Sequence, residues 1–460
     1  MVNLLRGRNA YFLLAIFAFA FIAIAYKGIS APQPGDENIY YYMGRLVSEG
    51  KIPYKDFFYA HPPLQIYLIA ALYKIFGFNI IVLKSLPLIS ALVSAFFIFK
   101  IAKEKFGELG ALASSLLFLF SYSVMFNSVF FFGVEIAAAF LIIGMYFLLN
   151  KKQYYIGGLF FGLASISRLL ALIPITVILL SVFFSGRKNF LKISTVFLSI
   201  FVSVNLLFIA ISHGEYATSV YKFHLLKSSG GDENFQEYSD IIKLNWILFA
   251  ASSLFIFAKD KKRLGLFVAV SIPFLIFLLS LKRLFGFYFL MAFPFLAIIG
   301  GYSLAQILKK LQTNKILLTA FISLLSVAFA WNLTADISFL KQTGFTGFER
   351  GNDMKEYIDS QPKELMLFGD SSSVPLLALL TNRKIALDFV DTNNQVFMSG
   401  IKDIGKVMDD LRGKNILFII RSKEGISRFD EVKKFLNSNC EFLSQFSDRS
   451  EGAYMMYKCR

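Results

Sequence analysis

The sequence predicts a polytopic α-helical membrane protein with a small C-terminal α/β domain. Of its 460 residues 56% are hydrophobic, only 17% are charged and 54 are Phe, which departs from the usage of ordinary globular proteins. Long apolar stretches recur as far as about residue 332, as expected for a chain that crosses a bilayer repeatedly. Beyond residue 345 the apolar runs are short and bounded by Gly, Asn and Asp, which is typical of strands.

The apolar stretches predict eleven transmembrane helices. The first follows Arg6 and Arg8 like a signal peptide, but no small-residue cleavage site follows it, so we expect it to be retained. The stretch 63–76 is too short for a confident span and predicts a re-entrant or interfacial helix. The eleven predicted ranges are 9–27, 79–100, 109–126, 134–149, 154–170, 171–185, 193–211, 246–258, 264–281, 285–304 and 315–332.

Basic residues alternate between the two ends of these helices and predict the orientation. Seventeen of them lie on one side, where only Glu104, Glu108 and Asp260 oppose them, so we expect that side and the N-terminus to be cytoplasmic. An odd number of spans then puts the C-terminal domain outside the cell membrane. The seventeen are Arg6, Arg8, Lys100, Lys103, Lys105, Lys151, Lys152, Arg187, Lys188, Lys192, Lys259, Lys261, Lys262, Arg263, Lys309, Lys310 and Lys315.

The distribution of charge excludes a basic nucleic-acid-binding domain. The net charge is +16, yet residues 335–460 hold 18 basic and 18 acidic side chains. The remaining 29 basic and 13 acidic residues fall in the membrane part. The excess of basic residues there is explained by the positive-inside rule, which places them on the cytoplasmic side of the helices. The three histidines, His61, His213 and His224, are scattered and only two cysteines exist, which argues against a structural zinc site.

These features divide the chain into a transmembrane domain, residues 1–334, and a soluble extracytoplasmic α/β domain, residues 345–460. Outer loops are predicted at about 28–78 and 212–245, and the second is too long to be a simple turn. In the tail, ELMLFG, KIALDFV and NILFIIR predict strands, and 374–381, 404–411 and 429–436 predict helices, which favours a partly parallel sheet. A hairpin turning at Arg449-Ser450 would place Cys440 opposite Cys459 and allow a disulfide outside the cell.

The first outer loop carries two adjacent carboxylates, Asp36 and Glu37, and then His61 before two prolines. Carboxylates beside a membrane are costly unless they are solvated or used, so the pair predicts a functional site. On an extended segment neighbouring side chains point to opposite sides. One acid is therefore expected to be catalytic, with Asp36 the first candidate, while the other fixes the loop.

Further charged residues lie at the predicted outer ends of helices, and the positive-inside rule does not require cations on that side of the membrane. Glu135 is the only carboxylate between Glu108 and Glu215, which makes it a second candidate for a functional acid. Alternatively, Glu135 stands at the start of a helix only because the helix dipole favours an acid there. Four cations on this face suit a lipid phosphate, and the Arg guanidinium is shaped for it. The alternative is snorkelling to lipid headgroups. The four are Lys84, Arg168, Lys282 and Arg283.

Residues 35–68 resemble the first outer loop of GT-C membrane glycosyltransferases, in particular the protein mannosyltransferase and aminoarabinose transferase branch (glycosyltransferase family 39/83-like). The shared pattern is Asp-Glu followed by Tyr, Gly, Pro-Tyr-x-Asp and His-Pro-Pro-Leu. The resemblance covers about residues 11–305. Glu135 matches a second acidic residue, often Asp, that these enzymes carry at the start of a helix. GGLFFGLASISR matches a helix of the family that ends in a cation, here Arg168. KRLFGFYFLMAFP matches a late helix, in which Arg283, Tyr288 and Pro294 occupy the places of a basic residue, Tyr and Pro.

The resemblance implies transfer of a sugar from a polyprenyl- or dolichyl-phosphate donor to an outward-facing protein, lipid or glycan acceptor, with inversion. Asp36 would accept the acceptor's proton, and the outer cations and Tyr288 would hold the lipid phosphate and sugar. His61 would contact the phosphate or the acceptor, unless it is simply a loop residue. The donor is a co-substrate, no bound cofactor is implied, and a divalent metal is left open.

Two alternatives belong to other classes. A transporter or flippase for a lipid-linked glycan predicts ionisable groups near the middle of the membrane and an internal repeat. A non-catalytic membrane scaffold that displays the tail predicts no requirement for Asp36.

Overall fold

The computed structural model describes residues 8–258, 260–422, 424–448 and 452–460. The predicted turn at Arg449-Ser450 and the predicted cytoplasmic residues Arg6 and Lys259 lie outside these ranges. The chain forms two compact units. The first comprises the described part of Met1–Ile29 with Lys84–Val204 and Gly230–Phe345; the second comprises Ser30–Leu83, Asn205–Ser229 and Thr346–Arg460. Most of the first outer loop and part of the second thus group with the C-terminal tail.

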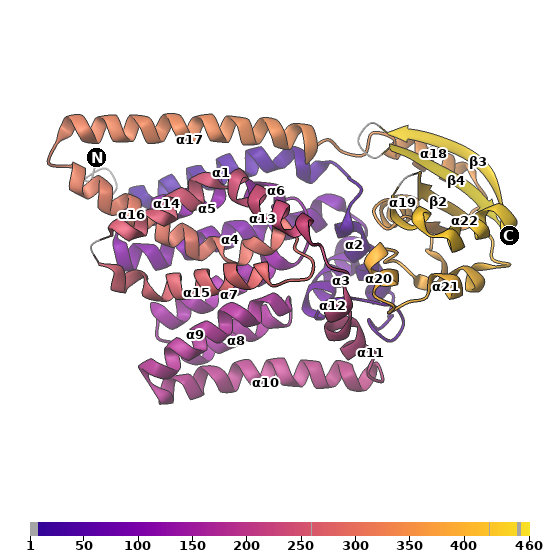
Figure 1. Cartoon of the computed structure of the whole chain (residues 1–460), viewed down its shortest axis with the longest axis horizontal. Coiled ribbons are helices and arrows are strands. Elements are labelled where there is room, and N and C mark those ends of the chain that lie inside the picture. The colour runs from indigo at the N-terminus through magenta and orange to yellow at the C-terminus, as the bar shows by residue number, and fades with distance from the viewer. Residues whose placement is uncertain (1–7, 259, 423, 449–451) are drawn as a thin grey trace. The chain divides into compact units, whose positions relative to one another are not determined.

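The first unit is a bundle of helices, most of which run side by side (Figure 1). Each of the eleven predicted ranges contains a helix, although several helices are shorter than their range. The 3₁₀ turn η6 (Gly286–Met291), for example, occupies the start of the range 285–304. The helices are α1 (Arg8–Ser30), α4 (Ile80–Phe106), α5 (Glu108–Leu119), α6 (Tyr122–Asn127), α7 (Val134–Leu149), α8 (Tyr154–Ser165), α9 (Leu172–Ser185), α10 (Arg187–Ile211), α13 (Asp232–Leu244), α14 (Trp246–Ser253), α15 (Gly265–Leu279), α16 (Phe293–Leu311) and α17 (Lys315–Thr343).

Five helices among the described residues are long and apolar enough to cross a membrane, so the chain is a multi-pass membrane protein. A sixth span results if α13 and the helical segment Trp246–Phe257, bent by 78°, are counted as one. The number of crossings and the orientation remain predictions. The five are Asn9–Ser30, Ile80–Phe106, Arg187–Ile211, Lys261–Leu279 and Lys315–Thr343.

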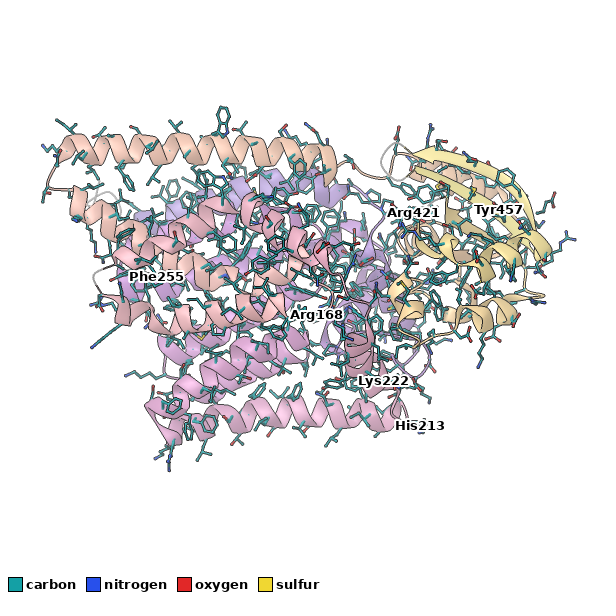
Figure 2. All side chains as sticks on the ribbon, viewed as in Figure 1. Arg168, His213, Lys222, Phe255, Arg421 and Tyr457 are labelled. Atoms are coloured by element: carbon teal, nitrogen blue, oxygen red, sulfur yellow. A yellow bond between two sulfur atoms is a disulfide. The ribbon has the colours of Figure 1, made fainter. Side chains whose placement is uncertain are left out.

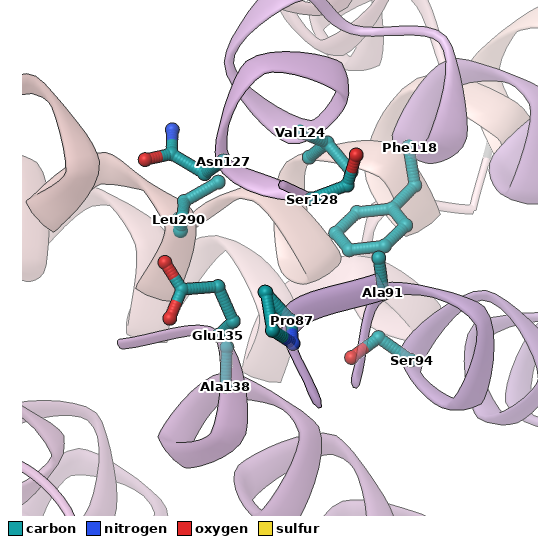
Figure 3. A pocket seen from close by; sticks show the side chains of 10 residues that line it. All are labelled: Pro87, Ala91, Ser94, Phe118, Val124, Asn127, Ser128, Glu135, Ala138 and Leu290. Carbon is teal, nitrogen blue, oxygen red and sulfur yellow. The ribbon is translucent and has the colours of Figure 1, made fainter. Parts of the chain in front are cut away.

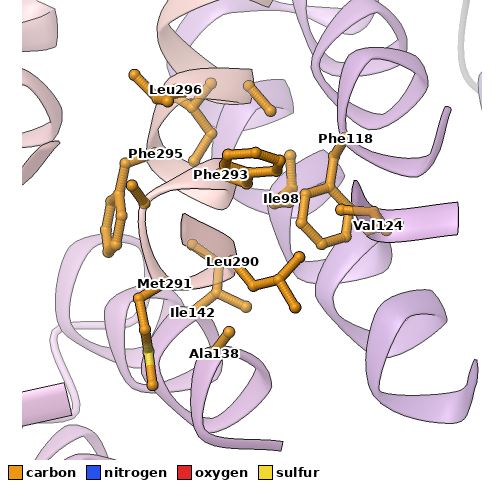
Figure 4. Packing of buried hydrophobic residues seen from close by; sticks show 14 of the residues in the cluster. Ile98, Phe118, Val124, Ala138, Ile142, Leu290, Met291, Phe293, Phe295 and Leu296 are labelled. Carbon is orange, nitrogen blue, oxygen red and sulfur yellow. The ribbon is translucent and has the colours of Figure 1, made fainter. Parts of the chain in front are cut away.

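The bundle is held by close packing of apolar side chains and small residues. Ile98, Phe118 and Ile142 meet Leu290 and Phe293 in its centre (Figure 4). Glycines let helix backbones approach, which stabilises helix pairs in lipid. In α8, Gly158 and Gly162 lie so close to Ile193 and Ile200 of α10 that neither position has room for a side chain. These two glycines are therefore contact residues between α8 and α10.

The second unit contains a four-stranded sheet in the order β1-β2-β4-β3. The strands are β1 (Met366–Gly369), β2 (Ile416–Arg421), β3 (Cys440–Asp448) and β4 (Gly452–Cys459). β1 and β2 are parallel and the other pairs antiparallel, so the sheet is partly parallel. Cys440 pairs with Cys459 in register, and a disulfide joins them. The helices of the tail are α18 (Gly351–Ser360), α19 (Val374–Leu380), α20 (Asn394–Met398), α21 (Ile404–Leu411) and α22 (Asp430–Asn439).

The strand predicted for KIALDFV is wrong. The segment makes one isolated bridge, Leu367 with Ile385, and then turns through the short 3₁₀ segment η7 (Ala386–Asp388). Leu387 and Asp388 both have positive φ, which a strand does not allow. Ile385 and Ala386 are nevertheless buried. The apolar run therefore indicated burial correctly, and burial alone does not specify a strand.

The outer segments add their own helices to the second unit. α2 (Asp36–Ser48) packs against α3 (Leu64–Phe76), and α19 of the tail packs against α2. The second outer segment contributes α11 (Glu215–Ala217) and α12 (Phe223–Leu226). A small apolar cluster joins all three parts of the unit and contains Phe58, Ala60, Phe223 and Val396.

Candidate functional site

The acidic pair lies in the first turn of α2, so the extended segment predicted for it is wrong. Successive helical residues are about 100° apart, and both carboxylates benefit from the helix dipole. Asp36 is partly exposed, whereas Glu37 is 0% exposed. The Glu37 carboxylate lies against Gly35, where no other side chain fits. Only Asp36 of the pair is thus placed to meet a substrate.

The turn that leads into α2 is fixed by Asn38. Its amide nitrogen donates to the carbonyls of Gln33 at 2.7 Å and of Gly35 at 3.1 Å. The Gly35 amide in turn donates to the carbonyl of Ser372 in the C-terminal domain at 2.9 Å. The position of Asp36 therefore depends on residues from both ends of the chain.

A third carboxylate, Asp391 of the C-terminal domain, was not predicted from the sequence. It is partly buried, and its charge interacts with those of Asp36 and Lys227. The pKa of Asp391 is raised from 3.8 to about 6, mainly by burial; the Asp36 charge also raises it, whereas the hydrogen bond from the Asn393 amide and the Lys227 charge lower it. Nothing in the local sequence DFVDTNN distinguishes Asp391 from an ordinary loop acid.

His61 stands in a polar and aromatic group of the same unit. The Tyr40 hydroxyl lies 3.2 Å from His61 Nε2, and the Tyr54 hydroxyl donates to the His61 carbonyl at 2.6 Å. The rings of His61 and His224 stack with centroids 5.5 Å apart. His224 Nε2 donates to the Ala60 carbonyl at 2.8 Å, since a carbonyl can only accept. Sequence reasoning assigned no chemistry to His224, which lies in the long second outer loop.

In the first unit Glu135 and Arg168 are both buried. They are 7% and 3% exposed, and their opposite charges interact. Glu135 is in the first turn of α7, where its carboxylate lines a small cavity of about 20 Å³ beside Pro87 and Leu290 (Figure 3). Arg168 lies inside the bundle, directly before the 3₁₀ turn Leu169–Ala171 (Figure 2). Buried ionisable side chains of this kind are a common feature of functional sites.

The four predicted cations occupy different environments. Lys84 is 0% exposed; its Nζ donates to the Gly28 carbonyl at 3.0 Å and lies 5.3 Å from the centroid of the Phe130 ring. Snorkelling to headgroups therefore does not explain Lys84 or Arg168, because both are buried in protein. Lys282, by contrast, is exposed. Arg283 forms an ion pair with Glu233 at 2.5 Å.

Tyr288 is buried in η6, with its ring edge-to-face against those of Phe285 and Phe287. Its segment packs on α7 and on the 3₁₀ turn that follows Arg168. The structure thus groups Tyr288 with the elements that carry Glu135 and Arg168. Tyrosines of membrane proteins also form aromatic belts at the bilayer interfaces, but such a role requires a more exposed ring.

Two further features bear on ligands. Within the described ranges, no group of three or more His, Cys, Asp and Glu side chains is placed to hold a metal ion. An apolar cavity of about 610 Å³ lies among α5, α14, α16 and α17 and is lined by residues such as Trp246, Leu304 and Phe329. No predicted site residue lines that cavity, so we assign it no role in catalysis.

The chain is similar to known glycosyltransferases in fold. The sequence profile of the family described as dolichyl-phosphate-mannose-protein mannosyltransferase matches residues 60–213. The structure of ArnT from Cupriavidus metallidurans bound to undecaprenyl phosphate superposes with a TM-score of 0.70 at 14% identity, over 96% of this chain and 97% of that one. The apo form of the same enzyme gives a TM-score of 0.72 at 13% identity, over 97% and 98%.

A more distant likeness is to the oligosaccharyltransferase of Archaeoglobus fulgidus in the apo form, with a TM-score of 0.59 at 12% identity over 85% of this chain and 66% of that one. A search of the curated proteins finds no significant match by sequence. The likenesses extend over nearly the whole chain and agree with the motif in its first outer loop. The chain therefore shares the fold of these membrane enzymes.

Proposed function

We propose that the protein transfers a sugar from a polyprenyl- or dolichyl-phosphate donor to an outward-facing acceptor on a protein, lipid or glycan, with inversion at the anomeric carbon. The partly exposed Asp36 at the start of α2, next to the fully buried Glu37, is the observation that carries the proposal. The similarity to ArnT, which is seen bound to undecaprenyl phosphate, supports a lipid-phosphate donor.

In the proposed reaction, the acceptor atom forms a bond to the anomeric carbon while the bond from that carbon to the phosphate oxygen breaks. Asp36 takes the proton that the acceptor loses. Lys84 and Arg168 are the best candidates to stabilise the charge that grows on the departing phosphate, since preorganised cations in a water-poor site act strongly on such charge. Glu135 acts on Arg168 through its charge.

The other predicted residues have supporting roles. Glu37 fixes the start of α2, and His61 with Tyr40 offers hydrogen-bonding groups to the acceptor or the phosphate. Tyr288 contacts the sugar, and Lys282 and Arg283 attract the anionic donor. Arg283 would have to exchange its ion pair with Glu233 to bind phosphate.

The test is transfer of label from radiolabelled polyprenyl-phosphate sugars into membrane fractions. Asp36→Asn keeps the size of the side chain but removes the base, so we expect the rate to fall about 10²- to 10⁴-fold. The matched control is Asp388→Asn, an acid of the same unit outside the shared motif. The Asp388 carboxylate pairs with Lys51 at 2.6 Å, and the oxygen of an Asn can still accept a hydrogen bond there.

Equal labelling by the wild type and Asp36→Asn would refute the assignment of the base. If folded wild-type protein transfers no label from any donor, the flippase and scaffold alternatives are favoured. Transport of a fluorescent lipid-linked glycan across the membrane of reconstituted vesicles would then distinguish a flippase from a scaffold. The chemical identity of the labelled product names the acceptor.

A further inference from the structure

The apolar cavity of about 610 Å³ in the first unit is lined by α17 together with α5, α14 and α16. Figure 1 shows α17 running along one side of the bundle. Within this fully described helix Asp336 and Leu340 are the buried residues, and both lie near its C-terminal end. The apolar middle of α17 therefore faces the bundle across the cavity. A space lined mostly by Leu, Ile, Ala and Phe offers water few hydrogen-bond partners, so in a bilayer we expect hydrocarbon to fill it.

The cavity wall continues into a short polar stripe on the same face of α17. Leu324 and Ala328 line the cavity, and Asn332 and Asp336 follow at intervals of four residues, which places all four on one side of the helix. Asn332 lines a smaller adjoining cavity that shares Phe329 with the large one. The polar side chains thus stand at one end of the apolar space.

Hydrogen bonds connect this stripe to α14. The indole Nε1 of Trp246, a residue that also lines the cavity, donates to Asn332 Oδ1 at 2.6 Å. Asn332 Nδ2 in turn donates to Asp336 Oδ2 at 2.6 Å. Asp336 is 7% exposed, and this donor is a neutral amide, so the negative charge of the carboxylate is not offset by it. A carboxylate in such a place is stabilised by a cation that also donates hydrogen bonds.

Asp336 fits at the level of the lipid headgroups. From Lys315 to Asp336 the helix α17 rises about 31 Å. The hydrocarbon core of a bilayer is about 30 Å thick, so these two residues fit at opposite interfaces. Trp246 agrees with this level, because its ring is 46% exposed and Trp favours the interface. The cavity residues of α17, within 324–329, then lie in the hydrocarbon region.

We propose that this cavity binds an acyl chain of an aminophospholipid whose ammonium group pairs with Asp336. Phosphatidylethanolamine has the required chemistry: a primary ammonium with N–H donors at the interface, and a chain that reaches the apolar space below it. The bound lipid would link α17 to α14 and α5. The inference goes beyond the proposed function, because no residue assigned to sugar transfer lines the cavity.

The test uses tryptophan fluorescence of the full chain in phosphatidylcholine vesicles. The chain has two tryptophans, so Trp331→Phe, at an exposed position of α17, leaves Trp246 as the sole fluorophore. Bromine atoms on an acyl chain quench a tryptophan that they contact. The vesicles contain a small fraction of either phosphatidylethanolamine or phosphatidylcholine with brominated chains. We expect the brominated phosphatidylethanolamine to bind roughly twofold to fivefold more tightly, as one ion pair near the surface allows.

Asp336→Asn in the same background should abolish this preference. The matched control is Asp240→Asn, which removes an acid of α13 that is 44% exposed and pairs with Lys243 at 3.1 Å. This variant should keep the preference. Ala328→Phe places a ring in the cavity and should lower quenching by both brominated lipids.

Equal quenching of Trp246 by the two brominated lipids would refute the inference, and this comparison decides even if Asp336→Asn does not fold. A preference that survives in folded Asp336→Asn would refute the pairing with the ammonium group. Stronger quenching by a polyprenyl phosphate with a brominated chain than by the brominated phosphatidylethanolamine would also refute the inference, and would assign the cavity to the tail of the donor.

Discussion

The buried pair Glu135–Arg168 gives the sharpest test of the charge arrangement in the first unit. Both side chains are less than one tenth exposed, and their charges interact. Neutralising one partner leaves the other as an uncompensated buried charge, which costs about 3–5 kcal/mol. Neutralising both removes the two desolvation penalties together with the attraction, so the double variant should lose much less than the sum of the single losses.

The measurement is a double-mutant cycle with Glu135→Gln, Arg168→Gln and the double variant. Unfolding in mixed detergent micelles, followed by circular dichroism, gives the change in free energy of unfolding for each. We expect a coupling energy above about 1 kcal/mol, because interacting residues couple within roughly 0.5–3 kcal/mol and both of these groups are buried.

The control cycle uses Lys103 and Glu108, an ion pair of the same unit at 3.4 Å whose side chains are 26% and 21% exposed. That pair should couple by about 1 kcal/mol or less, as partly solvated pairs do. Additive single losses for Glu135 and Arg168, with coupling no larger than in the control, would show that the two side chains do not act as a pair. The assignment of Arg168 as an oriented phosphate ligand would then lose its support.

Two other outcomes follow from the second unit. The Cys440–Cys459 disulfide closes a loop with a sequence separation of 19, so Cys440→Ser with Cys459→Ser should lower the free energy of unfolding of this unit by about 3 kcal/mol in the chain-entropy model. Denaturant unfolding followed by far-ultraviolet circular dichroism measures this, and an unchanged midpoint would show that the hairpin alone holds the strands. The pKa of Asp391 is raised from 3.8 to about 6 in the folded state, so the folded protein binds that proton more tightly and loses stability as pH rises through this window. Above pH 6, Asp391→Asn should therefore have a higher free energy of unfolding than the wild type, by at most about 3 kcal/mol, and a higher melting temperature. Below pH 4 this difference should vanish. A lower melting temperature of the variant above pH 6 would contradict the burial of a charged Asp391.

Local sequence was sufficient for much of the fold. Apolar stretches located eleven helices because a membrane helix must be apolar over most of its length, and this property is visible residue by residue. Short apolar runs bounded by Gly, Asn and Asp predicted strands β1 and β2 correctly, and the segments predicted as helices contain α19, α21 and α22. The segment KIALDFV failed because a buried run need not pair as a strand, and positive φ at Leu387 is invisible in a hydrophobic pattern.

The sequence by itself also determined which acids and cations are unusual for a membrane protein, since an ionisable group in an apolar stretch is costly wherever the chain folds. Only tertiary structure decided which of them meet. Glu37 turned out to be buried and Asp36 partly exposed because α2 presents the two side chains in different directions. The Ser372 carbonyl, in the loop that follows β1 of the C-terminal sheet, accepts from the Gly35 amide before Asp36, and no local pattern encodes a contact between segments so distant in sequence.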